Sequence, residues 1–244
     1  LHAAGEEGGW ETNYWYIWAL AFRRRYEQAR AELARFAERL ELAVKGQDRD
    51  RARLATILRR IEVIRIVIDI SADHLPAVRR NAEQWLAGTD RGMGHVAKAG
   101  ADSAFEIATV SCAAGYRDAN AGELKAARAM VRLAAVYSAQ ADNAYGLGWV
   151  AAIDALIKLR EGDYGVAHAN LADAMASVRR TLGEDAGIYG TLALLAAKAA
   201  IEMDRKDEAQ ELLARGWNQI FTYGLVDTTA HGLDAALKLW SGHD

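Results

Sequence analysis

Three short stretches decide the fold of this chain: Gly122-Glu-Leu-Lys-Ala-Ala127, Gly162-Asp-Tyr-Gly-Val-Ala167 and Asp204-Arg-Lys-Asp-Glu-Ala209. In each stretch, a turn-forming residue stands five positions before an alanine that opens an amphipathic helix. The three alanines lie 40 and 42 residues apart. Such a spacing is typical of a structural unit that repeats along the chain.

Small residues also recur at fixed distances from these alanines. Twelve positions before each alanine and seven positions after it, the sequence again has alanine or glycine: Gly115, Ala155 and Ala197 before, Ala134, Ala174 and Gly216 after. Two helices pack with their axes about 8–10 Å apart, and larger side chains between them would push the axes apart. The pattern therefore predicts pairs of closely packed helices, stacked as an all-α solenoid of the tetratricopeptide type.

The composition supports an all-helical protein. The 244 residues include a single proline, and 52% of them are hydrophobic, which is ample for a continuous core. The net charge of −3 argues against a nucleic-acid-binding surface, because such domains usually have a basic face. The single cysteine, Cys112, lies in an apolar run and is expected to be a buried thiol, which fits a cytoplasmic protein. The apolar runs are too short to span a membrane.

Glycine and aspartate breaks divide the chain into eleven expected helices. These are Glu11–Arg24, Glu27–Val44, Arg51–Ser71, Leu75–Leu86, Asp102–Gly115, Leu124–Tyr137, Ala144–Arg160, Val166–Leu182, Ile188–Met203, Lys206–Tyr223 and Asp227–Trp240. We expect one continuous domain, a right-handed α-α superhelix of about five helical hairpins. Residues 1–100 would form long, degenerate hairpins, and residues 101–244 would form three regular repeats plus a closing helix. The glycine-rich segment 89–100 is expected to be a loop or a frayed helix start.

The first expected helix is aromatic on all faces. Trp15, Trp18 and Phe22 recur at helical spacing and are predicted to be core residues, whereas Tyr14 and Tyr16 would lie on other faces. Because the sequence begins with leucine and not methionine, we expect it to be part of a longer protein. A preceding domain would then cover this helix, or the helix is exposed by truncation.

The C-terminal half resembles a known family. The stretch Glu202-Met-Asp-Arg-Lys-Asp-Glu-Ala-Gln-Glu-Leu-Leu213, the preceding turn at 160–167 and the segment Gly224–Asp227 are similar to the sensor region of the large ATP-dependent LuxR-type transcriptional regulators, the MalT-like group. The resemblance covers roughly residues 100–240. It implies a nucleotide-binding module before the helical superhelix and a DNA-binding helix-turn-helix after it. The sequence has no G-x-x-x-x-G-K-[ST] loop, and nothing after Trp240 could hold a recognition helix, so the chain would be the isolated sensor domain.

Motifs for catalysis, metals and cofactors are missing from the sequence. The six histidines are scattered, and none has the helical spacing of a zinc site. There is no G-x-S-x-G nucleophile elbow, and the glycines of segment 92–100 lack the strand that precedes a phosphate-binding loop. An all-helical enzyme such as a terpene cyclase or prenyltransferase would need acidic metal-binding clusters that the sequence lacks. We therefore expect neither an enzyme nor a cofactor in this fragment.

Six residues on the first helices of successive pairs are the candidate ligand-binding residues. In a right-handed superhelix these helices line the concave surface, where aromatic rings could stack on a small molecule or peptide and polar groups could orient it. Under the alternative interpretation, Trp149 and Tyr189 fill gaps between neighbouring helix pairs. The six candidates are Asn143, Tyr145, Trp149, Tyr189, Lys198 and Glu202.

The predicted function is that of an effector-sensing or partner-binding domain of a MalT-like regulator. A small-molecule inducer, a regulatory protein or a peptide would bind the concave groove and favour the active form, provided that it binds the two forms with different affinity. The other partners would be the flanking nucleotide-binding and DNA-binding domains, with no direct nucleic-acid or membrane contact, and this surface could also form a homo-oligomer. The alternative is a generic tetratricopeptide scaffold for protein–protein interaction, with no transcriptional role.

Overall fold

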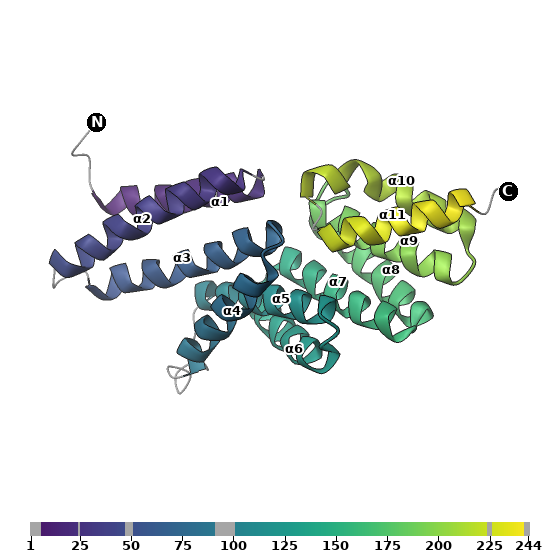
Figure 1. Cartoon of the computed structure of the whole chain (residues 1–244), viewed down its shortest axis with the longest axis horizontal. Coiled ribbons are helices and arrows are strands. Elements are labelled where there is room, and N and C mark those ends of the chain that lie inside the picture. Colours follow the sequence, from purple (N-terminus) through teal and green to yellow (C-terminus); the bar gives the residue numbers. More distant parts are fainter. Residues whose placement is uncertain (1–5, 24, 47–50, 91–100, 224–225, 242–244) are drawn as a thin grey trace. The chain divides into compact units, whose positions relative to one another are not determined.

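A computed structural model (Figure 1) describes residues 6–23, 25–46, 51–90, 101–223 and 226–241. All secondary structure in these residues is helical, as predicted. The prediction of about five hairpins understates the eleven helices found. Helices α3 and α10 have the predicted bounds. The helices are α1 (Glu6–Phe22), α2 (Tyr26–Gly46), α3 (Arg51–Ser71), α4 (Leu75–Asp90), α5 (Ala101–Asn120), α6 (Leu124–Gln140), α7 (Ala144–Glu161), α8 (Tyr164–Thr181), α9 (Gly187–Glu202), α10 (Lys206–Tyr223) and α11 (Val226–Ser241).

The chain divides into two compact units, Leu1–Ala77 and Val78–Asp244. The boundary falls within the first turn of α4. The sequence predicts a change of character at residue 100, but residues 91–100, with most of the glycine-rich segment, lie outside the described residues.

The first unit buries the aromatic face of α1 against α2 and α3, which also contact each other. The buried side chains described on α1 are those of Tyr14, Ile17, Trp18, Leu20 and Ala21, each at most 6% exposed, whereas Trp15 is 59% exposed. The prediction that Trp15 belongs to the core and Tyr14 to another face is therefore wrong, while Trp18 is in the core as expected. Because aromatic side chains occur on several faces of α1, its sequence does not reveal which stripe turns inward. The side chain of Phe22 lies outside the described residues.

In the second unit, each helical pair contacts the next in a regular order. The pairs are α5–α6, α7–α8 and α9–α10, and the second helix of each pair also contacts the following first helix. In addition, the first helices contact one another in sequence, α5 with α7, α7 with α9, and α9 with α11. Helix α11 thus follows α9 as the first helix of a further pair would.

The small residues of the repeat lie where helices approach most closely. Of the nine marker positions, eight are buried and only Ala174 is half-buried. A Cβ atom added at Gly115 would lie 3.3 Å from Cβ of Met130 on α6, and one added at Gly216 would lie 2.9 Å from Cγ of Leu194 on α9. The predicted close packing of the helix pairs is confirmed at these positions.

One residue in each turn of the second unit from α5 to α10 has a left-handed backbone. These residues are Gly122 (φ 79°), Asp142 (49°), Gly162 (81°), Gly183 (87°) and Asp204 (57°). At Gly162, the amide donates to the carbonyl of Leu159 at 3.3 Å, and the next amide donates to that of Lys158 at 2.9 Å. The same bonding order closes the turns at 122, 142 and 204, and it satisfies carbonyls that the helix end leaves unpaired.

At these left-handed positions, we expect opposite effects on stability from introducing a glycine and from replacing one. We expect Asp204→Gly to raise the free energy of unfolding by about 0.5–1 kcal/mol, because it relieves a left-handed conformation that is unfavourable for a residue with a Cβ atom. We expect Gly162→Ala to lower it by about 1 kcal/mol for the same reason. Urea unfolding of both variants measures the two changes, and a loss of stability in Asp204→Gly would contradict the account.

None of the helices in the described ranges is both long and apolar enough to cross a bilayer.

Candidate functional site

The predicted ligand residue Asn143 caps a helix. Its side-chain Oδ1 accepts a hydrogen bond from the amide of Gly146 at 3.0 Å, at the N-terminus of α7. A Cβ atom at Gly146 would lie 2.7 Å from Nδ2 of Asn143, so this cap depends on a glycine three residues later. The Asn143 side chain therefore caps the N-terminus of α7.

The predicted aromatic residues lie on α7 and α9. The rings of Tyr145 and Trp149 meet edge to face with centroids 6.5 Å apart, and Tyr116 of α5 meets Trp149 at the same distance. Tyr145 and Trp149 are half-buried, whereas Tyr189 is 4% exposed. The contact between Trp149 and the neighbouring first helix, and the burial of Tyr189, favour the gap-filling interpretation of these two residues.

The predicted residues Lys198 and Glu202 belong to an ion-pair network between α9 and α11. Nζ of Lys198 donates to Oε1 of Glu202 at 2.5 Å and also to Asp234. Nζ of Lys238 donates to the same Glu202 oxygen at 2.5 Å. The charges of Lys198, Glu202, Asp234 and Lys238 thus alternate across the helix contact, with Lys198 the most buried of the four.

The pKa values of this network follow from its hydrogen bonds. Burial lowers the pKa of Lys198, but its hydrogen bonds to Asp234 and Glu202 raise it more, and the net pKa lies above the usual range. Hydrogen bonds from Lys198 and Lys238 lower the pKa of Glu202, and the bond from Lys198 lowers that of Asp234. Lys198, Glu202 and Asp234 are therefore charged at neutral pH, and the hydrogen bonds within the network satisfy them.

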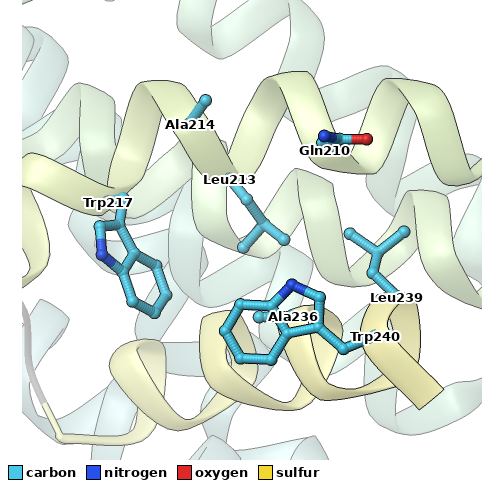
Figure 2. Close-up of a pocket in the computed structure, with 7 residues that line it drawn as sticks. All are labelled: Gln210, Leu213, Ala214, Trp217, Ala236, Leu239 and Trp240. Carbon is cyan, nitrogen blue, oxygen red and sulfur yellow. The ribbon is translucent and has the colours of Figure 1, made fainter. Parts of the chain in front are cut away.

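An apolar pocket lies between α10 and α11, away from the six predicted residues. Its volume is about 490 Å³, and it is lined by Gln210, Leu213, Ala214, Trp217, Ala236, Leu239 and Trp240. Figure 2 shows the indoles of Trp217 and Trp240 in the space between the two helices. Leu213 and Leu239 are each 7% exposed, whereas Trp240 is 66% exposed. The pocket thus has buried leucines and one tryptophan largely open to solvent.

This pocket was not predicted, because the six candidate ligand residues belong to the first helices of the pairs and the pocket lies between α10 and α11. Two of the seven tryptophans, Trp217 and Trp240, belong to the last two helices. The presence of these two tryptophans on successive helices was visible in the sequence and could have indicated an aromatic site. Their pairing across α10 and α11 required the tertiary structure.

A second hollow of about 770 Å³ lies along the N-terminal half of α6. It is more open to solvent than the α10–α11 pocket and has no aromatic side chain in its wall. Its lining residues are Gly122, Glu123, Leu124, Lys125, Ala126, Ala129 and Arg132. The α10–α11 pocket is therefore the better candidate for a ligand.

A buried charge cluster closes the C-terminal end of α5. Arg117 and Asp118, 8% and 4% exposed, form an ion pair, and Arg117 also lies 3.6 Å from Glu123. Burial raises the pKa of Asp118, against the lowering effect of Arg117. Glu123 in turn accepts from Arg79 of α4 at 3.2 Å. This cluster ties α4 and the end of α5 to the turn before α6.

Two observations concern metal binding and thiol reactivity among the described side chains. No group of three His, Cys, Asp or Glu residues among them could hold a metal ion. Burial raises the pKa of the Cys112 thiol to about 12, so the thiol stays protonated at neutral pH and is a poor nucleophile.

No family model matches this chain, and no curated protein or solved structure matches it either. We therefore infer a function from the residues and the geometry of the second unit.

Proposed function

We propose that this chain is an effector-sensing domain that binds a small, mainly apolar molecule between α10 and α11. The observation that carries the proposal is the pocket of about 490 Å³ with two tryptophans in its wall. Ligand pockets are typically a few hundred Å³ in volume and lined by apolar and aromatic side chains with a few polar groups. This pocket has that size and that lining.

The lining also limits the chemistry of the ligand. None of the seven lining residues carries a charge, and Gln210 is the one with a side chain that both donates and accepts hydrogen bonds. A phosphorylated or multiply charged ligand would lose its hydration without gaining a charged partner in the wall. We therefore propose a neutral aromatic ligand with one amide, hydroxyl or carbonyl group, whose ring packs against the indoles.

We further propose that the parent protein is a cytoplasmic transcriptional regulator of the MalT-like LuxR type. Of the residues that carry this resemblance, 160–167 span the turn from α7 to α8, 202–213 run from the end of α9 into α10, and 226–227 begin α11. In this proposal the second unit is a right-handed superhelix of tetratricopeptide-like hairpins, which the contacts between successive first helices support. The effector would shift the regulator toward its active form by binding that form more tightly.

The coding sequence on either side of this chain tests the regulator proposal. A phosphate-binding loop upstream and a helix-turn-helix downstream are expected. If both were absent from the complete reading frame, the regulator assignment would be wrong, and the pocket would remain to be tested by binding.

Two experiments test ligand binding in the pocket: a thermal-shift screen and a tryptophan substitution in the pocket lining. We expect thermal shifts with neutral aromatic amides and alcohols in a screen that also contains sugars, amines and phosphorylated metabolites. A ligand at 100 times its dissociation constant stabilises the folded protein by about 2.7 kcal/mol. Ala214→Trp adds an indole at an exposed lining position on α10, and it should weaken binding at least about tenfold.

Ala169→Trp is the matched control, because Ala169 is exposed on α8, outside the pocket. It should leave both the thermal shift and the affinity unchanged. Equal losses in the two tryptophan variants, or shifts confined to phosphorylated compounds, would contradict the proposed site.

A protein-binding scaffold with no transcriptional role is the second candidate. Trp240, 66% exposed at the pocket, is the observation that favours it, because exposed tryptophans often anchor protein partners. A screen without any small-molecule shift, from a folded sample, would favour this second candidate.

A further inference from the structure

Helix α6 has a basic face. Its charged residues are Lys125, Arg128 and Arg132, and it has no acidic residue, although the whole chain has a net charge of −3. Lys125, Ala129, Arg132 and Val136 follow one another at spacings of four, three and four residues, which places them on one side of the helix. We call these four residues the α6 face.

Two bases of the α6 face have no partner among the residues that the structure describes. Lys125 and Arg132 are exposed, and neither forms an ion pair or a side-chain hydrogen bond there. Arg128, beside the face, is already paired with Glu161 of α7. Glu123, just before α6, is already engaged by two arginines, at 3.2 and 3.6 Å. The charges of Lys125 and Arg132 are therefore available to a partner molecule.

The repeat provides an internal comparison for these two bases. Lys125 lies two positions before the marker alanine of its repeat, and Arg132 lies five positions after it. The residues at the same two positions in the other repeats are Gly165 and Ala172 on α8, and Asp207 and Ala214 on α10. The other two helices thus have no base at either position. The packing of the helix pairs therefore does not explain the two bases.

A hollow lies between the two bases. Lys125 and Arg132 both line the hollow of about 770 Å³, and Ala126 and Ala129 line it between them. Seven residues of α-helix separate the two bases by about 10 Å along the axis. Because the residues between them are alanines, a second helix could approach α6 closely at this point.

This spacing indicates the shape of the partner. A single carboxylate or phosphate is too small to reach two cations about 10 Å apart. A helix with two acidic residues seven positions apart presents its carboxylates on one face, at the same distance from each other. With small residues between the acids, such a helix matches the α6 face in both charge and shape.

We propose that the α6 face binds an acidic amphipathic helix of a partner protein, whose two carboxylates pair with Lys125 and Arg132. Val136, 63% exposed, would contact an apolar residue of the same helix. This inference goes beyond the proposed function, because the α6 face shares no residue with the α10–α11 pocket.

Fluorescence anisotropy with a labelled helical peptide tests the proposal on the complete chain. The probe is an alanine-rich peptide with two glutamates seven residues apart, and the comparison peptide has glutamine at both positions. At low ionic strength the glutamate peptide should bind at least about tenfold more tightly than the glutamine peptide. Added salt should reduce this difference, because it screens exposed charges.

Reversing the charges of the α6 face should reverse its preference. The double variant Lys125→Glu with Arg132→Glu should bind the glutamate peptide at least about tenfold more weakly, and it should bind a peptide with two lysines instead. Because both side chains are exposed, the circular dichroism and the melting curve should stay those of the parent. The matched control is Arg180→Glu with Lys206→Glu, on exposed positions of α8 and α10, which should keep the parent's affinity.

Three results would overturn the proposal. A glutamate peptide that binds no better than the glutamine peptide would mean that the two bases select no acidic helix. Equal losses in the two double variants would mean that the overall charge of the chain attracts the peptide. A single-stranded oligonucleotide that binds the α6 face more tightly than the peptide would mean that the face binds nucleic acid. None of these results bears on the pocket, which the thermal-shift screen measures separately.

Discussion

Replacing Gly216 with valine should lower the free energy of unfolding by about 3 kcal/mol. A Cβ atom at this position would lie 2.9 Å from Cγ and Cδ2 of Leu194 and 3.0 Å from the carbonyl oxygen of Gly190. Leu194 has little room to move away, because a Cβ atom at Gly232 on its α11 side would also lie 2.9 Å from Cδ2. Valine would therefore force α10 away from α9 and open the packing of three helices.

Gly165→Val separates this packing effect from the general effect of a glycine exchange. Gly165 lies in the first turn of α8, and the nearest atom to an added Cβ is Sδ of Met203, at 4.0 Å. Chemical unfolding followed by circular dichroism should show a change within about 0.5 kcal/mol for this variant. Similar losses for both variants would mean that the close approach at Gly216 is not what stabilises the α9–α10 pair.

Replacing Lys198 with methionine should lower the free energy of unfolding by about 2 kcal/mol at pH 7. The change removes the cation that hydrogen bonds to both Glu202 and Asp234, and it leaves Glu202, 21% exposed, with Lys238 as its remaining cation in the network. Lys125→Met on the exposed face of α6 is the control, with an expected change below about 0.5 kcal/mol.

The difference between the parent and Lys198→Met should depend on pH in the acid range. The network lowers the pKa of Glu202 and of Asp234 in the folded protein. The stability that these carboxylates contribute is therefore fully present above their unfolded pKa values of about 4, and it is lost as the pH falls through the lower folded values. Unfolding at pH 7, 4 and 2.5 should show the two proteins converging, and a constant difference would contradict the ion-pair account.

The positions of the helices could be predicted from the sequence because the signals for a helix are local. The turn at Gly162, the alanine five residues later and the alanines twelve residues before and seven residues after that alanine all lie within one helical hairpin. Left-handed glycines and aspartates end the helices, and small residues mark where two helices meet. The handedness of the superhelix stays a prediction, and so does the relation to the MalT-like regulators.

Which face of a helix turns inward was less predictable. Helix α1 is aromatic on every side. The predicted stripe is right at Trp18 but wrong at Trp15, which is exposed, whereas Tyr14, expected on another face, is buried. Periodicity identifies a buried face only where polar residues mark the opposite one.

The candidate site depended on contacts between residues far apart in the chain. The six predicted residues had suitable chemistry for a ligand, but Asn143 hydrogen bonds to the start of its own helix, and Lys198 is engaged by Asp234, 36 residues later. The pocket likewise brings Trp217 and Trp240 together from two helices. The sequence alone determined an all-helical chain with closely packed pairs, because propensity, turns and small residues act locally. Only the tertiary structure decided which polar groups satisfy one another and where an apolar space remains, because both depend on side chains that meet across helices.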